Sequence, residues 1–387
     1  MTTLSARKPT EEMEERKEQL RVLLSATKEE IDNLVRMSPS VLSYRDIKGN
    51  HGPKLALLQE RLGISKEAAG RLFLKGNRVL GTSLATLEKK MDWLQARLNL
   101  NRSQLRTIVE RVPNALTYSI EDNLGPTFDN IQSILELSDK ELTKIIARKP
   151  DVLQYNMSAE NMTQRMPLLQ TLLGLQEDDI EGLRKKCVEA PNLLFWPEES
   201  MKGNQQWLRQ RFGLGDAKIA QMCRFKPQLL YANATTLDDK AGSIQSDLSL
   251  SDDELSDLVS KFPTLLGYCP EKNVRQKLRY LRTRFELDED ALKNLVLKQP
   301  ALFSLSQGNI EEKLQFYSKL VGEEEAKRLV VKSSNLLMRS LEKRLKPRLE
   351  EVKKIGVKVR WNDTLLRRLA MRTDGQWEAY GLGDTKT

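Results

Sequence analysis

The stretch Arg148-Lys149-Pro150-Asp151-Val152-Leu153-Gln154-Tyr155 decides the fold, because versions of it return eight more times along the 387-residue chain. The copies lie 34 to 41 residues apart, and seven of the 14 prolines stand at the same place within them. A fixed period between 20 and 50 residues indicates a solenoid, in which each repeat buries its apolar face against its neighbours. The equivalent positions, called the proline column below, are Pro39, Asn77, Pro113, Pro150, Pro191, Pro227, Pro263, Pro300 and Ser334.

A helix is predicted to lead into each member of this column. Twelve residues earlier stands a residue suited to begin a helix, and in seven of nine repeats it is Ser, Thr, Asn or Asp, whose side-chain oxygen accepts from the first turn. Glu30, Gln104, Glu141 and Glu254 predict four capping boxes. We expect helices of about twelve residues, ended by the proline. The predicted starts are Thr27, Ser65, Asn101, Ser138, Asp179, Gly215, Ser251, Asp288 and Gly322.

A short turn and another helix complete each repeat. An apolar residue always stands three positions after the proline column, where we expect it to fill the seam between helices. Proline suits the first position of a short 3-10 or single helical turn. The other helix precedes the predicted start and ends with Gly63, Gly174 or Gly213 as a C-cap in three repeats. Asn77 and Ser334 replace proline, so we expect looser helix ends there.

The predicted fold is therefore all-α, a helical solenoid of about nine repeats, each with two helices and a short 3-10 turn. Because stacked repeats make one continuous body, we expect one domain rather than several. Residues 1–25 would be a capping helix or flexible lead, 26–340 the nine repeats, and 341–387 a basic capping segment with a polar tail.

Positive charge is concentrated near the carboxyl terminus. The net charge of +9 comes entirely from residues 271–387, which hold 26 basic and 17 acidic side chains. Residues 339–372 alone hold 12 basic and 4 acidic side chains. Such a field favours a polyanion, above all nucleic acid, although an anionic lipid or an acidic protein would also respond to it.

The sequence offers no catalytic or metal-binding set. His51 is the only histidine, and Cys187, Cys223 and Cys269 are too widely spaced for a zinc site or a redox motif. The sequence also contains no glycine-rich loop of the kind that cradles phosphates. We expect no enzyme, no cofactor and no metal. No apolar run approaches the roughly 18 residues of a membrane span, so no membrane partner is expected.

The repeat resembles that of the mitochondrial transcription termination factor (mTERF) family. The resemblance rests on the proline, the apolar residue at +3, an aromatic or apolar residue near +5, and an upstream ladder ending Leu-Gly-Leu or Leu-Gly-Ile. It covers about residues 26–372, and residues 340–348 are similar to the family's C-terminal segment. It implies a left-handed superhelix that binds nucleic acid on its concave face and acts in mitochondria or plastids. Glu11 and the acidic residues after it are atypical of a transit peptide.

A basic column lies two residues before the proline column in six of nine repeats. Stacking superimposes equivalent positions, so these side chains should form a row able to follow a phosphate backbone. The alternative is that cations in a last turn only complement the helix dipole. The predicted nucleic-acid-binding residues are Lys75, Arg111, Arg148, Lys149, Lys226, Lys261, Lys298, Lys332, Arg344, Lys346 and Arg348.

We predict a monomeric regulator that binds double-stranded DNA and terminates or otherwise regulates transcription. Two alternatives stay open: an RNA-binding factor in ribosome assembly or intron splicing, and a helical scaffold for protein partners. Reading of bases needs Arg, Asn or Gln at base edges, and a second basic column supplies candidates that could equally be a solvated helix face. These candidates are Arg61, Arg97, Arg211, Arg284 and Lys319.

Overall fold

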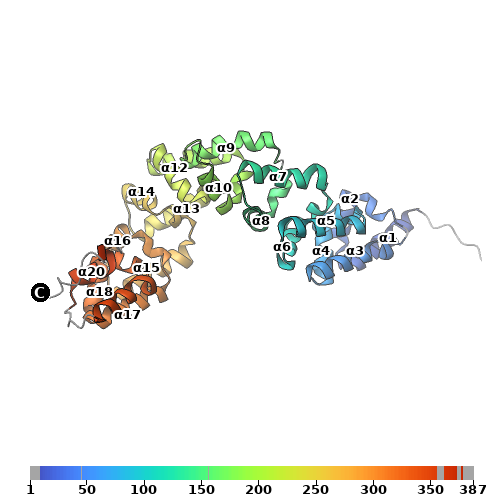
Figure 1. The fold of residues 1–387 in the computed structure, drawn as a ribbon. Coiled ribbons are helices and arrows are strands. Elements are labelled where there is room, and N and C mark those ends of the chain that lie inside the picture. Colours follow the sequence, from blue (N-terminus) through green and yellow to red (C-terminus); the bar gives the residue numbers. More distant parts are fainter. Residues whose placement is uncertain (1–8, 45, 156, 355–360, 373–375, 378–387) are drawn as a thin grey trace, which may run out of the picture. The chain divides into compact units, whose positions relative to one another are not determined.

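The computed structural model describes residues 9–44, 46–155, 157–354, 361–372 and 376–377. Within these ranges the chain is built from helices and turns, without strands, as the repeat predicts (Figure 1). It divides into two compact units, Met1–Lys202 and Gly203–Thr387, where the sequence predicted one domain. Solenoid repeats contact only their neighbours, so an even period does not require one compact unit.

Each repeat begins with an odd-numbered helix, the first helix of the repeat. The helix α1, which precedes the predicted array, takes this position in the first repeat and buries Leu20 and Leu24. The first helices are α1 (Pro9–Leu24), α3 (Ile47–Leu62), α5 (Leu84–Leu98), α7 (Gly125–Ile134), α9 (Ala159–Leu173), α11 (Glu198–Phe212), α13 (Ala234–Asp247), α15 (Gln276–Phe285) and α17 (Gln307–Val321).

The second helices begin after the predicted residues in all nine repeats. Side-chain caps are present at seven starts, and all four predicted capping boxes form. Each helix has 10 residues rather than twelve, because the cap and the residue before the proline column both lie outside it. These helices are α2 (Lys28–Met37), α4 (Lys66–Lys75), α6 (Arg102–Arg111), α8 (Asp139–Arg148), α10 (Ile180–Glu189), α12 (Asp216–Phe225), α14 (Asp252–Lys261), α16 (Glu289–Lys298) and α18 (Glu323–Lys332).

A 3-10 turn follows every second helix and confirms the predicted short turn. The apolar residue three positions after the proline column is buried in every repeat, from Leu42 to Leu337. The turns are η1 (Pro39–Leu42), η2 (Val79–Gly81), η3 (Pro113–Thr117), η5 (Pro150–Gln154), η6 (Pro191–Leu194), η7 (Pro227–Leu230), η8 (Pro263–Gly267), η10 (Pro300–Ser304) and η11 (Ser334–Met338).

A left-handed residue stands at or just after the end of every first helix. The predicted C-caps Gly63, Gly174 and Gly213 are among them, with φ between 60° and 67°. Glycine adopts this conformation without steric cost, whereas Ser, Asn and Glu occupy it in other repeats. The remaining members are Ser25, Asn99, Glu136, Ser249, Glu286 and Gly322.

The expectation of looser helix ends at Asn77 and Ser334 is wrong. The helices α4 and α18 keep 10 residues, and the N–H groups of Gly76 and Ser333 donate to the last turn at 2.8 Å, as in the proline repeats. The residue before the proline column leaves the helical region in both repeats, with φ of −101° at Gly76 and −136° at Ser333. The second helix therefore ends at the same place with or without proline in this column.

The carboxyl-terminal segment continues beyond the ninth repeat. A π-helical turn, η12 (Leu341–Leu345), leads into α19 (Lys346–Lys354), as η4 (Ile120–Leu124) and η9 (Pro270–Arg275) lead into α7 and α15. The last helix, α20 (Asp363–Met371), contacts η11 and η12. It buries Leu366, Leu369 and Ala370 and so covers the end of the array.

The cap at Ser138 gives a direct test of how the second helices are fixed. The Ser138 hydroxyl accepts a hydrogen bond from the N–H of Glu141. The Glu141 carboxylate in turn accepts one from the N–H of Ser138 at 2.9 Å. Ser138→Ala should lower the free energy of unfolding by about 1 kcal/mol. Ser133→Ala, in the exposed face of α7, is the matched control and should stay within about 0.5 kcal/mol of wild type. Equal urea midpoints for the two variants would contradict the capping role.

Candidate nucleic-acid interface

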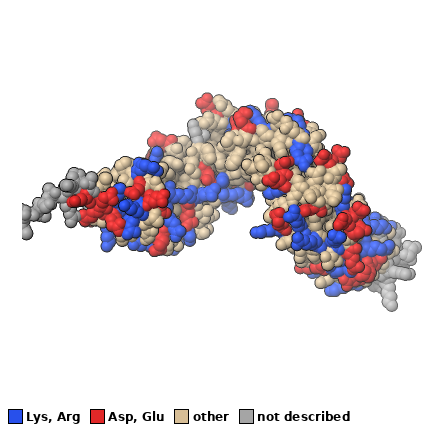
Figure 2. Space-filling view, turned by 180° about the vertical axis from the view of Figure 1, so that it is seen from behind, with Lys and Arg blue, Asp and Glu red and all other residues tan. Residues whose placement is uncertain are grey.

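The basic column occupies the last residue of the second helices. Lys75, Arg111 and Arg148 end α4, α6 and α8 in the amino-terminal unit, and all three are exposed. In the carboxyl-terminal unit, the exposed residues Lys261, Lys298 and Lys332 end α14, α16 and α18. We call these six residues the basic row. Figure 2 shows one face of the molecule, on which basic and acidic side chains are interspersed.

Half of the basic row contacts the helix end of the next repeat. The Lys75 ammonium donates to Glu110 O at 2.7 Å, and Arg148 donates to Glu189 O at 2.8 Å. The Lys298 ammonium donates to Lys332 O at 2.8 Å. These acceptors are carbonyl groups at the ends of second helices, where the dipole is negative. The contacts of Lys75 and Lys298 reach the helix ends that carry the next members of the row, Arg111 and Lys332, whereas Arg148 contacts the helix that ends with Glu189.

Two members of the row have carboxylate partners instead. Arg111 donates to Asp151 at 3.0 Å, and Lys149 pairs with the same carboxylate at 3.3 Å. Although burial alone would raise the pKa of Asp151, the hydrogen bond from Arg111 and the charge of Lys149 lower it. Lys261 pairs with Asp257 within its own helix at 2.5 Å. Carboxylates therefore offset part of the positive charge of the row at Arg111 and at Lys261.

The remaining predicted residues differ in access to solvent. Lys226 and Arg344 are half-buried, and Lys346 is exposed and pairs with Glu342. Arg348 is 3% exposed, donates to Leu369 O at 2.9 Å and lies over the Trp377 ring. Its prediction as a nucleic-acid contact therefore conflicts with the structure, because its guanidinium holds α19 against α20. A local excess of basic residues does not distinguish buried from exposed ones.

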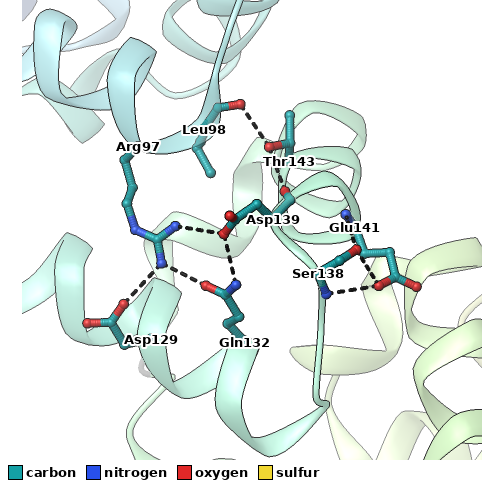
Figure 3. Close-up of polar contacts among 8 residues, drawn as sticks. All are labelled: Arg97, Leu98, Asp129, Gln132, Ser138, Asp139, Glu141 and Thr143. Carbon is teal, nitrogen blue, oxygen red and sulfur yellow. Dashed lines mark hydrogen bonds and ion pairs between the residues drawn. The ribbon is translucent and has the colours of Figure 1, made fainter.

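The second basic column joins the first helices of neighbouring repeats. Arg97 on α5 donates to Asp129 at 3.1 Å and to Gln132 at 2.7 Å on α7, and it pairs with Asp139 on α8 at 3.5 Å (Figure 3). Its side chain is only 25% exposed. The guanidinium thus has three partners within the protein and is poorly placed to read bases.

Three further candidates for base reading repeat this arrangement. Their partners on the next first helix are Asp92 for Arg61, Asp238 for Arg211 and Glu311 for Arg284, at 2.6 to 2.9 Å. Only Lys319 of the five candidates is exposed. We call the contacts of Arg61, Arg97, Arg211 and Arg284 the arginine staples. These arginines join neighbouring repeats, so we no longer interpret this column as base-reading.

One repeat carries the staple with its charges exchanged. Asp247 on α13 stands where α5 and α11 have Arg97 and Arg211, and Arg275 on the next repeat donates to it at 2.8 and 2.9 Å. The sequence separation of 28 residues matches the 27 residues between Arg211 and Asp238. At this position an ion pair between repeats can therefore form in either orientation.

A third polar column is buried, and sequence reasoning missed it. Lys54 donates to Leu80 O at 2.6 Å and Lys313 to Leu337 O at 2.5 Å, so a first helix is tied to the following 3-10 turn. Both ammonium groups are 4% exposed, and burial lowers the pKa of each. The sequence does contain a signal for this column, because basic or amide residues recur in it at nearly even spacing. The other members with this contact are Arg165, Asn204, Lys240 and Lys277.

The described residues show neither a metal site nor a membrane span. Among them, no group of three or more His, Cys, Asp or Glu residues is placed to hold a metal ion. No described helix combines the length and the apolar character that a bilayer crossing needs. Cys187 and Cys223 are buried, and burial raises the pKa of each thiol to about 12.

Comparison with known families points to one of them. A family model described as mTERF matches residues 20–284 and 240–361, which together span most of the chain. The match begins within α1, includes the rest of the first repeat and the eight repeats after it, and reaches the start of the carboxyl-terminal segment. No match was found among curated proteins.

The exchanged pair suggests a charge-swap test of an arginine staple. Arg61→Asp and Asp92→Arg should each lower the free energy of unfolding by about 1 kcal/mol, because each leaves like charges facing each other between repeats. The double variant restores the pair in the orientation of Asp247 and Arg275 and should recover at least half of the summed loss. A double-mutant cycle from urea denaturation measures this coupling. Strictly additive effects would rule out a staple.

The buried column predicts a dependence of stability on pH. The folded-state pKa of Lys313 lies below its ordinary 10.5, so between these two values the unfolded chain binds more protons. The free energy of unfolding contributed by Lys313 therefore rises with pH through that window. The stability difference between wild type and Lys313→Met should shift in favour of wild type from about pH 8 to about pH 10. Lys319→Met, on the exposed face of the same helix, is the matched surface control. A stability difference for Lys313→Met that stays constant over this pH range would contradict the assignment.

Proposed function

Because the chain belongs to the mTERF family, we propose that it is a nucleic-acid-binding regulator of organellar gene expression whose ligand is double-stranded DNA. In this proposal it acts in mitochondria or plastids and regulates transcription, by termination or a related step. The observation that carries the proposal is the basic row, in which six of the nine second helices end with an exposed cation.

The contacts of the row with carbonyl groups are compatible with this role. A lysine ammonium has three N–H donors and an arginine guanidinium has five. Lys75 and Lys298 each use one donor on a carbonyl of the next repeat, which holds the ammonium in place and leaves donors for a phosphate. Helix-dipole complementation and phosphate binding are therefore two consequences of the same placement.

The spacing of the row supports contact with a backbone rather than with bases. One cation per repeat can neutralise phosphates at intervals and position the protein without reading sequence. The arginines of the staples are paired with carboxylates within the protein, so base reading would need other side chains. We therefore propose that the row supplies affinity and that specificity arises elsewhere or from the shape of the duplex.

Salt dependence of binding tests the proposal. Six phosphate contacts give a slope of roughly −5 in a plot of log affinity for duplex DNA against log salt. The triple variant Lys75→Gln, Arg111→Gln, Lys261→Gln should bind at least about tenfold more weakly and reduce the slope by roughly 2 to 3. Fluorescence anisotropy with a labelled duplex at several salt concentrations measures both quantities.

A charge-matched control separates the row from the general positive charge. Lys89, Lys185 and Arg328 are 67 to 69% exposed and lie outside the row, so their triple replacement by Gln should leave the slope nearly unchanged. Equal losses of affinity in the two triple variants would reject the row as the interface.

Tighter binding of single-stranded or structured RNA than of duplex DNA at one salt concentration would assign RNA as the ligand. If the triple variant of the row binds nucleic acid as tightly as wild type, the alternative of a helical scaffold for protein partners is favoured.

A further inference from the structure

The buried column lacks its nitrogen donor in one repeat. A member of the column stands in each of the nine first helices, eight residues before the apolar residue at the helix end. Seven members donate to a carbonyl group of the turn that follows in the same repeat. Thr127 on α7 is the one member without a side-chain nitrogen. The nine members are Arg16, Lys54, Lys90, Thr127, Arg165, Asn204, Lys240, Lys277 and Lys313.

A hollow of about 400 Å³ lies beside the exceptional residue. Thr127 lines it together with Leu153 and Tyr155, which stand three and five positions after the proline column. In the other repeats the carbonyl groups that accept from the buried column lie two to five positions after the proline column. Asn130, further along α7, donates to Met157 O at 2.9 Å instead. We call this site the Thr127 hollow.

The next repeat shows what fills the equivalent place elsewhere. Arg165 on α9 donates to Leu193 O at 2.7 Å and also to Trp196 O. It lines a smaller hollow of about 320 Å³ together with Tyr155 and Phe195, whose rings stack with centroids 4.5 Å apart. A planar guanidinium has five donors in a fixed fork and packs against aromatic faces, so it suits this frame of carbonyl groups and rings. The fold itself therefore uses a cation at this place.

The lining of the Thr127 hollow is complementary to a cation. Asp122 contributes a carboxylate, and the described lining includes neither lysine nor arginine. The Ser119 hydroxyl donates to this carboxylate at 2.8 Å, and no ion pair joins it to a cation of the described residues. Tyr118 and Tyr155 add aromatic rings, whose faces attract cations. A phosphate would meet a negative charge here without a positive one, so the hollow disfavours nucleic acid.

We propose that the Thr127 hollow binds an arginine side chain of a partner protein. The guanidinium donates to the turn that lacks its donor, pairs with Asp122 and packs against the ring of Tyr155, which is 46% exposed. Asn123 and Gln154 are exposed members of the same lining, and their amides can hydrogen-bond the backbone of the segment that carries the arginine. This partner site is independent of the proposed nucleic-acid binding.

Titration of the full chain with N-acetylarginine amide, followed by NMR at constant ionic strength, tests the site. The probe should bind at least about tenfold more tightly than N-acetylcitrulline amide, which has a similar shape without the charge. Asp122→Asn should weaken binding of the probe roughly two- to fivefold. Glu160→Gln, on an exposed position of α9 outside the Thr127 hollow, removes the same charge and should leave binding unchanged.

Thr127→Lys gives a sharper test, because it supplies the donor that the other repeats carry. This variant should abolish binding of the probe. Tyr155→Leu, which removes an exposed ring, serves as a second variant if Thr127→Lys melts early, and it should weaken binding. Equal binding of the arginine and citrulline probes, or unchanged binding in both variants, would overturn the assignment.

Two further measurements separate a partner protein from other ligands. A blocked pentapeptide with one arginine between glycines should bind more tightly than N-acetylarginine amide, since its backbone reaches the amides of Asn123 and Gln154. Weaker binding of the pentapeptide would point to a small organic cation and reject a partner protein. Duplex DNA and RNA should bind Thr127→Lys no more weakly than wild type. A loss of nucleic-acid affinity in this variant would place nucleic acid in the Thr127 hollow and likewise reject the proposal.

Discussion

The structure depends on the fixed length of the second helix. A side-chain cap holds its start in seven repeats, and the residue before the proline column leaves the helical region at its end, as at Lys149 with φ −140° and ψ 75°. Ten residues remain between the two in every repeat, even where Asn77 or Ser334 replaces proline. Because length is constant, equivalent side chains recur at equivalent places, and contacts between repeats can recur as well.

Polar side chains carry many of these recurring contacts. Solenoid repeats have long, thin cores, and each helix end presents carbonyl groups without partners. Cations of the basic row and the arginine staples satisfy carbonyl or carboxylate groups of the neighbouring repeat, and the buried lysines satisfy carbonyl groups of the turn in their own repeat. The high content of charged residues, 30%, is thus partly structural. A basic residue in such a chain cannot be assigned to a ligand from its charge alone.

The sequence predicts what local chemistry determines. Caps, capping boxes, 3-10 turns and the buried residue at +3 follow from short-range rules, and the structure has them at the predicted residues. Contacts across some 30 residues were harder to predict. Arg97 and Asp129 are both ordinary surface residues in sequence, and only stacking brings them within 3.1 Å. The same holds for Arg348, whose burial depends on α20.

The two ends of the basic column show why position along the array matters for function. In the amino-terminal unit the column begins with Met37, which is 66% exposed, so the row gains cations only from the second repeat onward. In the carboxyl-terminal unit it ends at Lys332, where α20 adds Arg367 and where serine takes the place of proline. Inner repeats have a neighbour on each side, so a cation such as Lys75 combines a contact to the next repeat with exposure to solvent. The last repeat has a neighbouring repeat on one side only, and α20 covers its other side with Leu366, Leu369 and Ala370.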